Sequence, residues 1–218
     1  MSDTDTIRLY KFYSAQWGVD SLKKTRLKIS TLDDLNDPFE FNGFSFKNKK
    51  DRLAWLKTRK QLWQNKGLIS FSDRWSNPVI WSHYAENHKG ICLGFDVSKN
   101  FAFKVLYPPT REHIPSISEI VDTNDSEVLK KMSLTKYAHW EYENEWRVFI
   151  KLGQPDNDLF FEGYSDKMQL REIIIGAESD LSSQQLRRHC SNSVEVHTAR
   201  LAFKAFRIVP QKLKRLQK

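Results

Sequence analysis

Residues 140–150 read WEYENEWRVFI, and they place Glu141, Glu143 and Glu145 directly before a run of strongly strand-forming residues. Successive side chains of a β-strand point to opposite faces, so this spacing of two predicts that the three carboxylates share one face. Like charges on one face oppose folding, because each carboxylate makes ionisation of its neighbour less favourable. The pattern therefore indicates a functional site. The alternative is a solvated edge strand whose carboxylates pair with some of the many lysines.

On either side of this segment, the hydrophobic pattern predicts a mixed α and β fold in which strands dominate. Apolar alternation and apolar runs predict strands at residues 7–13, 26–30, 68–72, 90–96, 103–107, 145–151, 170–176, 194–199 and 203–208. Helical spacing and capping residues predict helices at 14–24, 50–64, 79–85 and 182–190, and a loop with a helix across 116–136. The polar residues 33–40 are typical of turns.

The composition predicts one domain across residues 1–218, because this length suffices for one core and no linker rich in Pro, Gly or Ser divides it. Lys and Arg number 35 against 27 Asp and Glu, and the net charge of +8 favours contact with polyanions such as nucleic acid. Part of this charge lies in a basic C-terminal tail, residues 211–218, whereas residues 1–6 form a polar N-terminus. No apolar run approaches the roughly 20 residues that span a bilayer, so we expect a cytoplasmic protein without membrane contact.

Short motifs of several common enzyme classes are absent from the sequence, which has no Gly-rich phosphate loop, no His-Glu-x-x-His helix and no Gly-x-Ser-x-Gly turn. Cys92 and Cys190 are too few and too far apart to suggest a disulfide framework or a zinc site. His83 and His88, with Glu86 between them, could hold a metal, but a helix end and a turn histidine account for the same residues. We therefore assign no metal site to them.

A sharper constellation joins three separated segments: Arg8, Tyr10 and Lys11 in the predicted first strand, Ser70-Phe71-Ser72, and Glu143-Asn144-Glu145. In this order they resemble the Arg/His, Ser-x-Ser, Glu-x-Glu pattern of the ADP-ribosyltransferase superfamily. The resemblance implies an α+β fold with a split, mainly antiparallel β-sheet, flanking helices and a cleft that binds NAD. It also implies a set of roles: Lys11 or Arg8, with Tyr10, at the dinucleotide, Ser70 and Ser72 as supports of the site, Glu145 as the catalytic carboxylate, and Glu143 placing the acceptor nucleophile.

The chemistry of NAD cleavage also accounts for these residue types, independently of the resemblance to a family. Breaking the nicotinamide glycosidic bond builds an oxocarbenium-like cation, and a fixed carboxylate beside the ribose stabilises this cation more in the transition state than in the ground state. Glu145 fits that role. Glu143, two residues earlier, could deprotonate or orient the attacking group. Taken singly, each short motif also fits a polar strand face or a surface strand.

A second resemblance covers nearly the whole chain. The blocks that carry it are LYKF at 9–12, LNDPFE at 35–40, ISFS at 69–72, WSHYA at 81–85 with Lys89-Gly90, and WEYENEWR at 140–147. They look like the ordered blocks of an uncharacterised bacterial domain-of-unknown-function family. That family is encountered among bacterial and mobile-element genes, so the resemblance implies a prokaryotic cytosolic protein and a role as a toxin or phage-defence effector, but it supplies no mechanism.

Further candidate residues lie in these blocks. His83 and Tyr84 could line a pocket for an aromatic, anionic ligand such as NAD, while a hydrogen-bonded core histidine is the other interpretation of His83. The Asn36-Asp37-Pro38 segment is typical of a turn. Arg147 follows Glu145 by two residues, and it either neutralises the acidic face or binds a phosphate.

We therefore expect an enzyme that transfers ADP-ribose from NAD to a nucleic acid or protein acceptor, with an antitoxin or other inhibitory partner where the activity is toxic. The principal alternative is a metal-dependent nuclease, in which Glu141, Glu143, Glu145 and Asp37 bind Mg²⁺. A non-catalytic nucleic-acid-binding protein that acts through its lysine-rich surface is the other form of this alternative.

Overall fold

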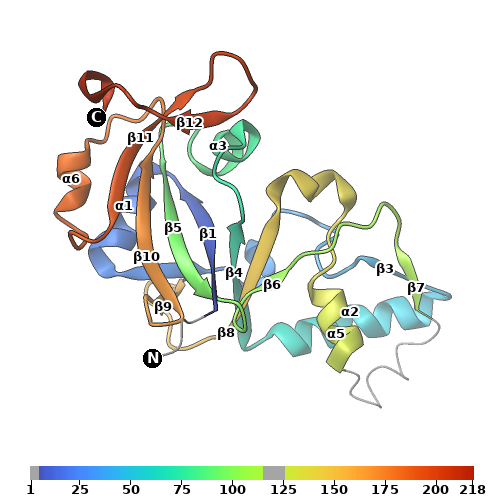
Figure 1. Ribbon diagram of the computed structural model, residues 1–218. Coiled ribbons are helices and arrows are strands. Elements are labelled where there is room, and N and C mark those ends of the chain that lie inside the picture. The colour runs from blue at the N-terminus through green and yellow to red at the C-terminus, as the bar shows by residue number, and fades with distance from the viewer. Residues whose placement is uncertain (1–4, 115–125) are drawn as a thin grey trace.

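Residues 5–114 and 126–218 are described in a computed structural model of the chain. The largest element is a curled, mostly antiparallel sheet of eight strands in the order β12-β11-β10-β5-β1-β4-β8-β6 (Figure 1). Within this sheet only β10 and β11 run parallel. In chain order, its strands are β1 (Thr6–Tyr13), β4 (Lys66–Ser72), β5 (Ile91–Ser98), β6 (Phe103–Lys104), β8 (Glu145–Lys151), β10 (Met168–Ile175), β11 (Glu195–Leu201) and β12 (Ile208–Pro210).

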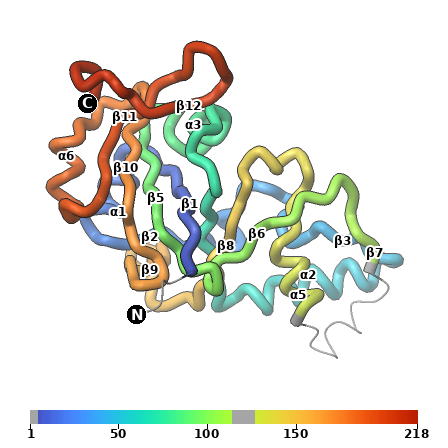
Figure 2. Tube along the Cα trace, viewed as in Figure 1, coloured from blue at the N-terminus to red at the C-terminus, as the bar shows by residue number. Residues whose placement is uncertain are grey.

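Two small sheets and several helices surround the large sheet. The small sheets pair β2 (Arg26–Ile29) with β9 (Phe160–Gly163) and β3 (Phe44–Phe46) with β7 (Glu112–Ile114). The helices are α1 (Ala15–Lys24), α2 (Lys49–Trp63), α3 (Pro78–Tyr84), α5 (Ser126–Ser133), α6 (Ser183–Arg187) and the 3₁₀ helices η1 (Leu32–Asp34), η2 (Ala138–Glu143) and η3 (Lys214–Leu216). In Figure 2, α2, α5, β3 and β7 gather beyond the β8–β6 edge of the large sheet. Among the helices described, none is long and apolar enough to cross a membrane.

Apolar side chains of the central strands form the main core. Leu9 of β1, Leu93 and Phe95 of β5, and Ile173 of β10 are all completely buried in one cluster. Complete burial of side chains of this size stabilises the fold by about 1.5–3 kcal/mol each relative to exposure. The central strands are therefore a rigid support on which polar side chains at the neighbouring strands can be held in place.

Local sequence fixes the position of α3. The Asn77 side chain accepts a hydrogen bond from the Val79 backbone N–H at 2.9 Å, and Pro78 occupies the first turn, where a missing N–H costs nothing. After Tyr84 the chain leaves the helix through residues 86–88, which all have positive φ angles. This unwinding turns the chain directly into β5 and leaves Tyr84 at the end of the helix that faces the sheet opening.

The sheet opens between β1 and β4. β1 pairs with β5 along its whole length and β4 pairs with β8 along its whole length, but β1 and β4 are paired only at Tyr10 and Ser72. Nearer the start of β4, Leu68 pairs instead with Ser30, which follows β2. Between these two points the Lys11 ammonium donates a hydrogen bond to the Ser70 carbonyl at 3.2 Å. The continuous sheet is thus interrupted at one place, and a lysine occupies part of the interruption.

Most predicted elements are confirmed to within a few residues. These are the strands predicted at 7–13, 26–30, 68–72, 90–96, 145–151, 170–176 and 194–199 and the helices predicted at 14–24, 50–64 and 79–85. The strand predicted at 103–107 is only two residues long, and the helix predicted at 182–190 ends at Arg187. In the segment 203–208, only Ile208 lies in a strand, because residues 203–207 form exposed bends. Of the predicted loop and helix at 116–136, the helix α5 is observed, and residues 115–125 lie outside the described residues.

The single acidic face predicted for residues 141–145 is wrong. Residues 138–143 form η2, Asn144 takes a left-handed conformation with φ of 45°, and the strand begins only at Glu145. Asparagine tolerates this conformation better than most residues because its short side chain bonds locally. As a result Glu141 is exposed, whereas Glu143 and Glu145 are buried.

Candidate functional site

A cavity of about 230 Å³ lies at the opening between β1 and β4, and we call it the β1–β4 cavity. Its walls come from the two strands, from α3, from residues 30–40 and from the segment that leads into β8. It is lined by seven of the nine predicted site residues, namely Tyr10, Lys11, Ser70, Ser72, Tyr84, Glu143 and Glu145. The structure therefore brings the three separated sequence segments together at one place. It also adds Glu40 and Lys136, which the sequence did not single out.

Glu145 is the most tightly held carboxylate of the cavity, with an exposed fraction of 4%. Its Oε1 accepts a hydrogen bond from the Ser70 hydroxyl at 2.7 Å and another from Arg147 Nε at 2.9 Å. Its Oε2 accepts from Arg147 Nη2 at 2.9 Å. Burial opposes ionisation, but the charges of Arg147 and Lys136 outweigh it and lower the pKa of Glu145 to about 2. Glu145 is therefore a fixed anion at every physiological pH.

Arg147 lies completely buried behind the cavity. Besides its two bonds to Glu145, it donates from Nη2 to Glu40 Oε1 at 2.6 Å and from Nη1 to the Ser133 carbonyl at 2.7 Å. Burial disfavours its charge, yet the two carboxylates more than compensate and raise the pKa of Arg147. Of the two sequence interpretations of this residue, neutralisation of the carboxylates is the one that the structure supports, because its side-chain nitrogens are already used.

Lys136 forms a second buried cation beside the same carboxylates. Its ammonium donates to Glu143 Oε2 at 2.6 Å and lies 3.5 Å from Glu145 Oε2 and 3.9 Å from Glu40 Oε2. Burial alone would lower the pKa of Lys136, but the three carboxylates raise it. When all five groups of this cluster are ionised, three negative and two positive charges leave an excess of one negative charge.

Glu143 is fixed from both sides. One oxygen accepts from Lys136, and the other accepts a short hydrogen bond from the Tyr84 hydroxyl. The Tyr84 hydroxyl in turn accepts from the Asn36 side-chain amide at 2.8 Å. Burial and the adjacent Glu143 raise the pKa of Tyr84 well above its usual value, so its proton stays in this bond. Glu143 consequently acts as an anchor between α3 and the acidic segment.

Lys11 is the remaining cation on the cavity wall. Burial lowers its pKa to about 8, against the opposing influence of Glu145. The only hydrogen bond acceptor that it contacts among the described residues is the Ser70 carbonyl, so the other N–H bonds of its ammonium are available to a ligand. Ser72, in contrast, is buried and its hydroxyl donates to the Arg74 carbonyl at 3.0 Å, which stabilises the turn after β4.

Two predicted site residues do not line the cavity. Arg8 lies two residues before Tyr10, toward the start of β1, where it pairs with Asp96 of β5 at 2.7 Å and with Glu172 of β10 at 3.6 Å. His83 is exposed, and its Nδ1 forms a hydrogen bond with the Tyr142 hydroxyl at 3.0 Å. Of the two cations between which the sequence left the choice open, Lys11 lines the cavity and Arg8 does not.

The carboxylates proposed for Mg²⁺ do not converge. Glu143 and Glu145 line the cavity, but Asp37 and Glu141 do not. Asp37 is buried and accepts a hydrogen bond from the Phe39 backbone N–H at 2.9 Å, as a turn residue does. Within residues 5–114 and 126–218, no group of three or more His, Cys, Asp or Glu side chains is arranged to hold a metal ion.

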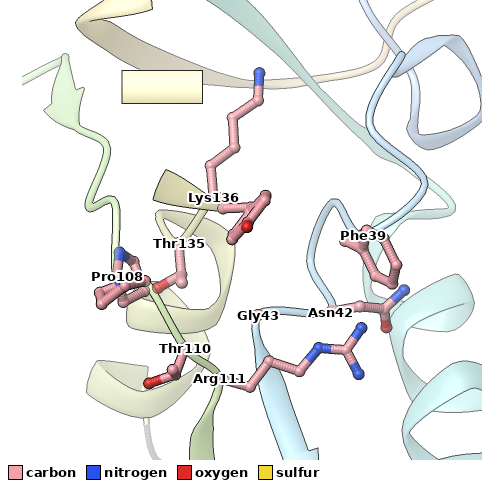
Figure 3. Close-up of a pocket in the computed structure, with 10 residues that line it drawn as sticks. Phe39, Asn42, Gly43, Pro108, Thr110, Arg111, Thr135 and Lys136 are labelled. Carbon is pink, nitrogen blue, oxygen red and sulfur yellow. The ribbon is translucent and has the colours of Figure 1, made fainter. Parts of the chain in front are cut away.

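A second cavity, of about 240 Å³, lies on the other side of Lys136 (Figure 3). Its walls include Phe39, Asn42, Pro108 and Arg111, and the Arg111 guanidinium lies 4.8 Å from the centre of the Phe39 ring. In Figure 3 the ammonium of Lys136 points away from Arg111, so only the stem of this lysine belongs to the second cavity. Of these two cavities, it is the β1–β4 cavity that Glu40, Glu143 and Glu145 line.

Comparison with known proteins gives one match. A family model described as "Protein of unknown function (DUF2971)" matches residues 80–148, and over this segment the chain is similar to that family. The matched segment contains Tyr84, Lys136, Glu143, Glu145 and Arg147, but not Lys11 or Ser70. No curated protein and no solved structure matches the chain. The resemblance to ADP-ribosyltransferases stays a prediction from the residues.

Proposed function

We propose that the protein is an ADP-ribosyltransferase-like enzyme that takes NAD as substrate and transfers ADP-ribose to a macromolecular acceptor. The observation that carries this proposal is Glu145: a buried carboxylate, held by Ser70 and Arg147, at the wall of a cavity in the split of an antiparallel sheet. An anion that is fixed before the reaction stabilises a developing cation without reorganisation at the moment of bond breaking.

In the proposed reaction the bond between the ribose C1′ and the nicotinamide nitrogen breaks, and nicotinamide leaves with the electron pair. The positive charge that builds on the ribose is stabilised by Glu145. An oxygen or nitrogen of the acceptor then forms a bond to C1′ and releases its proton to solvent water. Because both Glu143 oxygens already accept hydrogen bonds, we assign Glu143 the role of positioning Tyr84 and Lys136 rather than that of taking this proton.

The size and charge of the cavity favour one part of NAD over the rest. Ligand pockets that enclose a drug-sized molecule measure about 300–1,000 Å³, and the β1–β4 cavity is smaller, at about 230 Å³. It suits the nicotinamide ribose end, while the rest of the dinucleotide would extend over the rim. The free N–H bonds of Lys11 are suited to the diphosphate, since an ammonium binds phosphate oxygens as a point charge.

The test is release of nicotinamide from NAD labelled in that ring, measured with and without candidate acceptors. Wild-type protein should release nicotinamide, and Glu145→Gln should reduce the rate at least 100-fold, the lower end of what is lost with one electrostatic donor, about 10²–10³. Glu141→Gln is the matched control, because Glu141 is an exposed carboxylate of the same segment and does not line the cavity.

A chelator is included in every reaction, since the proposed transfer needs no metal whereas a metal-dependent nuclease would stop. Folding of both variants is checked by thermal unfolding, because Glu145 is buried against Arg147. Absence of release by the wild-type protein, or equal release by a folded Glu145→Gln variant, would remove the enzyme assignment.

A further inference from the structure

The connection between β11 and β12 presents two large rings to solvent. Phe203 is 94% exposed and Phe206 is 102% exposed, whereas the next most exposed large apolar residue of the described chain, Leu201, is 58% exposed. Leaving a ring entirely in water forfeits the stabilisation that burial would bring. We call residues 200–207 the aromatic-basic loop, and its exposure indicates a role in binding.

Each of the two rings has a cation beside it in the sequence. Lys204 follows Phe203 and Arg207 follows Phe206, and the Arg200 guanidinium lies 5.0 Å from the centre of the Phe203 ring. Residues 196–218 contain seven Lys and Arg and no Asp or Glu. The ligand of this surface is therefore expected to be polyanionic.

The aromatic-basic loop is ordered by its own backbone and adjoins the candidate site. The Ala202 N–H donates to the Arg207 carbonyl at 3.0 Å and closes the loop. At its base, the Ile208 N–H donates to the Ser76 carbonyl at 2.8 Å. Ser76 belongs to the segment between Ser72, on the cavity wall, and α3, and Figure 1 shows the loop beside α3. A ligand on the loop would thus lie on the α3 side of the β1–β4 cavity.

We propose that the aromatic-basic loop binds single-stranded nucleic acid, with Phe203 and Phe206 stacking on bases and the adjacent cations contacting phosphates. Stacking accepts any base, because every base has a π-face, and phosphate contacts add affinity that depends on salt. A lipid surface would favour a contiguous apolar tip, whereas here Lys204 and Arg207 interrupt the apolar surface. A role for the loop in presenting an acceptor to the cavity depends on the function proposed above. Binding of nucleic acid by the loop does not depend on it.

The experiment measures the fluorescence anisotropy of a labelled single-stranded oligonucleotide of about 20 nucleotides, longer than the sites of single binding modules. The chain of 218 residues is titrated without NAD at low salt. Phe203→Ser combined with Phe206→Ser should weaken binding by about 100-fold, roughly tenfold for each stacked ring. Trp17→Ser is the aromatic control, since Trp17 is 47% exposed on α1, outside the loop, and it should leave binding unchanged.

The charges are tested in the same assay. Replacing Arg200, Lys204 and Arg207 by Gln should reduce the magnitude of the slope of log K against log salt by about two. Each lost phosphate contact on a single strand contributes roughly 0.7 to this slope. The control replaces three exposed lysines of α2, namely Lys49, Lys57 and Lys60, by Gln. It changes the net charge equally and should leave most of the slope in place.

Several outcomes would overturn the proposal. In the anisotropy assay, these are equal oligonucleotide binding by the double phenylalanine variant and the unmodified chain, and an equal loss of salt dependence in the α2 control and the loop variant. The other two are binding of anionic phosphatidylserine vesicles without binding of the oligonucleotide, and self-association of the chain through the loop. Since no NAD is present, loss of this proposal would leave nicotinamide release intact. Conversely, failure to cleave NAD would leave oligonucleotide binding intact.

Discussion

Replacing Arg147 by Met should destabilise the protein more than any surface charge replacement. The substitution keeps an unbranched side chain in the buried position but removes four hydrogen bonds, two to Glu145, one to Glu40 and one to the Ser133 carbonyl. Removing one partner of a buried ion pair costs about 3–5 kcal/mol, because the remaining charge is left uncompensated. For a chain of this length each kcal/mol lowers Tm by about 2–4 °C, so the expected loss is about 6–20 °C.

The assay is urea and thermal unfolding at pH 7, with Arg8→Met as the matched control. Arg8 also pairs with a carboxylate at 2.7 Å, but its side chain is 39% exposed, so its removal should cost about 1 kcal/mol or less. Adding Glu145→Gln to Arg147→Met should restore part of the lost stability, because the uncompensated charge is then gone. If Arg147→Met cost no more than Arg8→Met, or if the second substitution restored nothing, the burial argument for this cluster would be refuted.

Two further predictions concern the cavity wall. Burial lowers the pKa of Lys11 from 10.5 to about 8, so the unfolded chain binds this proton more tightly between those values, and the Lys11 contribution to the free energy of unfolding should rise as pH increases from 8 to 10.5. Urea titrations of wild type and Lys11→Met at both ends of this range should show the rise in the wild type only, and parallel curves would contradict it. Ser70→Ala should cost about 1.5–3 kcal/mol, the worth of a hydrogen bond to a charged group, and should slow nicotinamide release. Ser72→Ala, which affects only a turn, should not slow release, and an equal effect of the two variants would count against the assigned role of Ser70.

The elements of the fold were predictable where local pattern decides them. The alternation of 7–13 and the Asn77-Pro78 start of α3 require no knowledge of distant residues. The three-residue strands β3 and β7 were not predicted, since so short a segment carries too little pattern, and the four-residue strand β9 was not predicted either. The acidic face was misjudged for a related reason: a single left-handed residue, Asn144, ends η2 and changes the direction of the chain between Glu143 and Glu145. Nothing in the spacing of the carboxylates indicates that change.

The residues that complete the site were hidden for a different reason. Glu40 is 107 residues from Arg147, to which it is bonded, and it lies in a segment whose composition is typical of a turn. Lys136 is one of many lysines, and only its burial distinguishes it. A group of carboxylates that cannot all face water requires buried cations to compensate its charge. This requirement predicts that the carboxylates have cationic partners, but it does not identify which Lys or Arg residues they are.

The charges of the cluster also bear on which ligand the cavity suits. When all six groups are ionised, Arg147 and Lys136 leave the three carboxylates Glu40, Glu143 and Glu145 with one uncompensated negative charge, and Lys11 on the wall brings the total to zero. A divalent cation would therefore add two charges that nothing compensates, at positions already taken by Lys136 and Arg147. The diphosphate of NAD would contact Lys11 on the wall, and Glu145 would then face the cation that develops on the ribose. Because Lys136 and Arg147 already occupy the carboxylate oxygens, the cluster disfavours a metal ion there. The Lys11→Met variant should weaken NAD binding while leaving the hydrogen bonds of Glu145 to Ser70 and Arg147 in place.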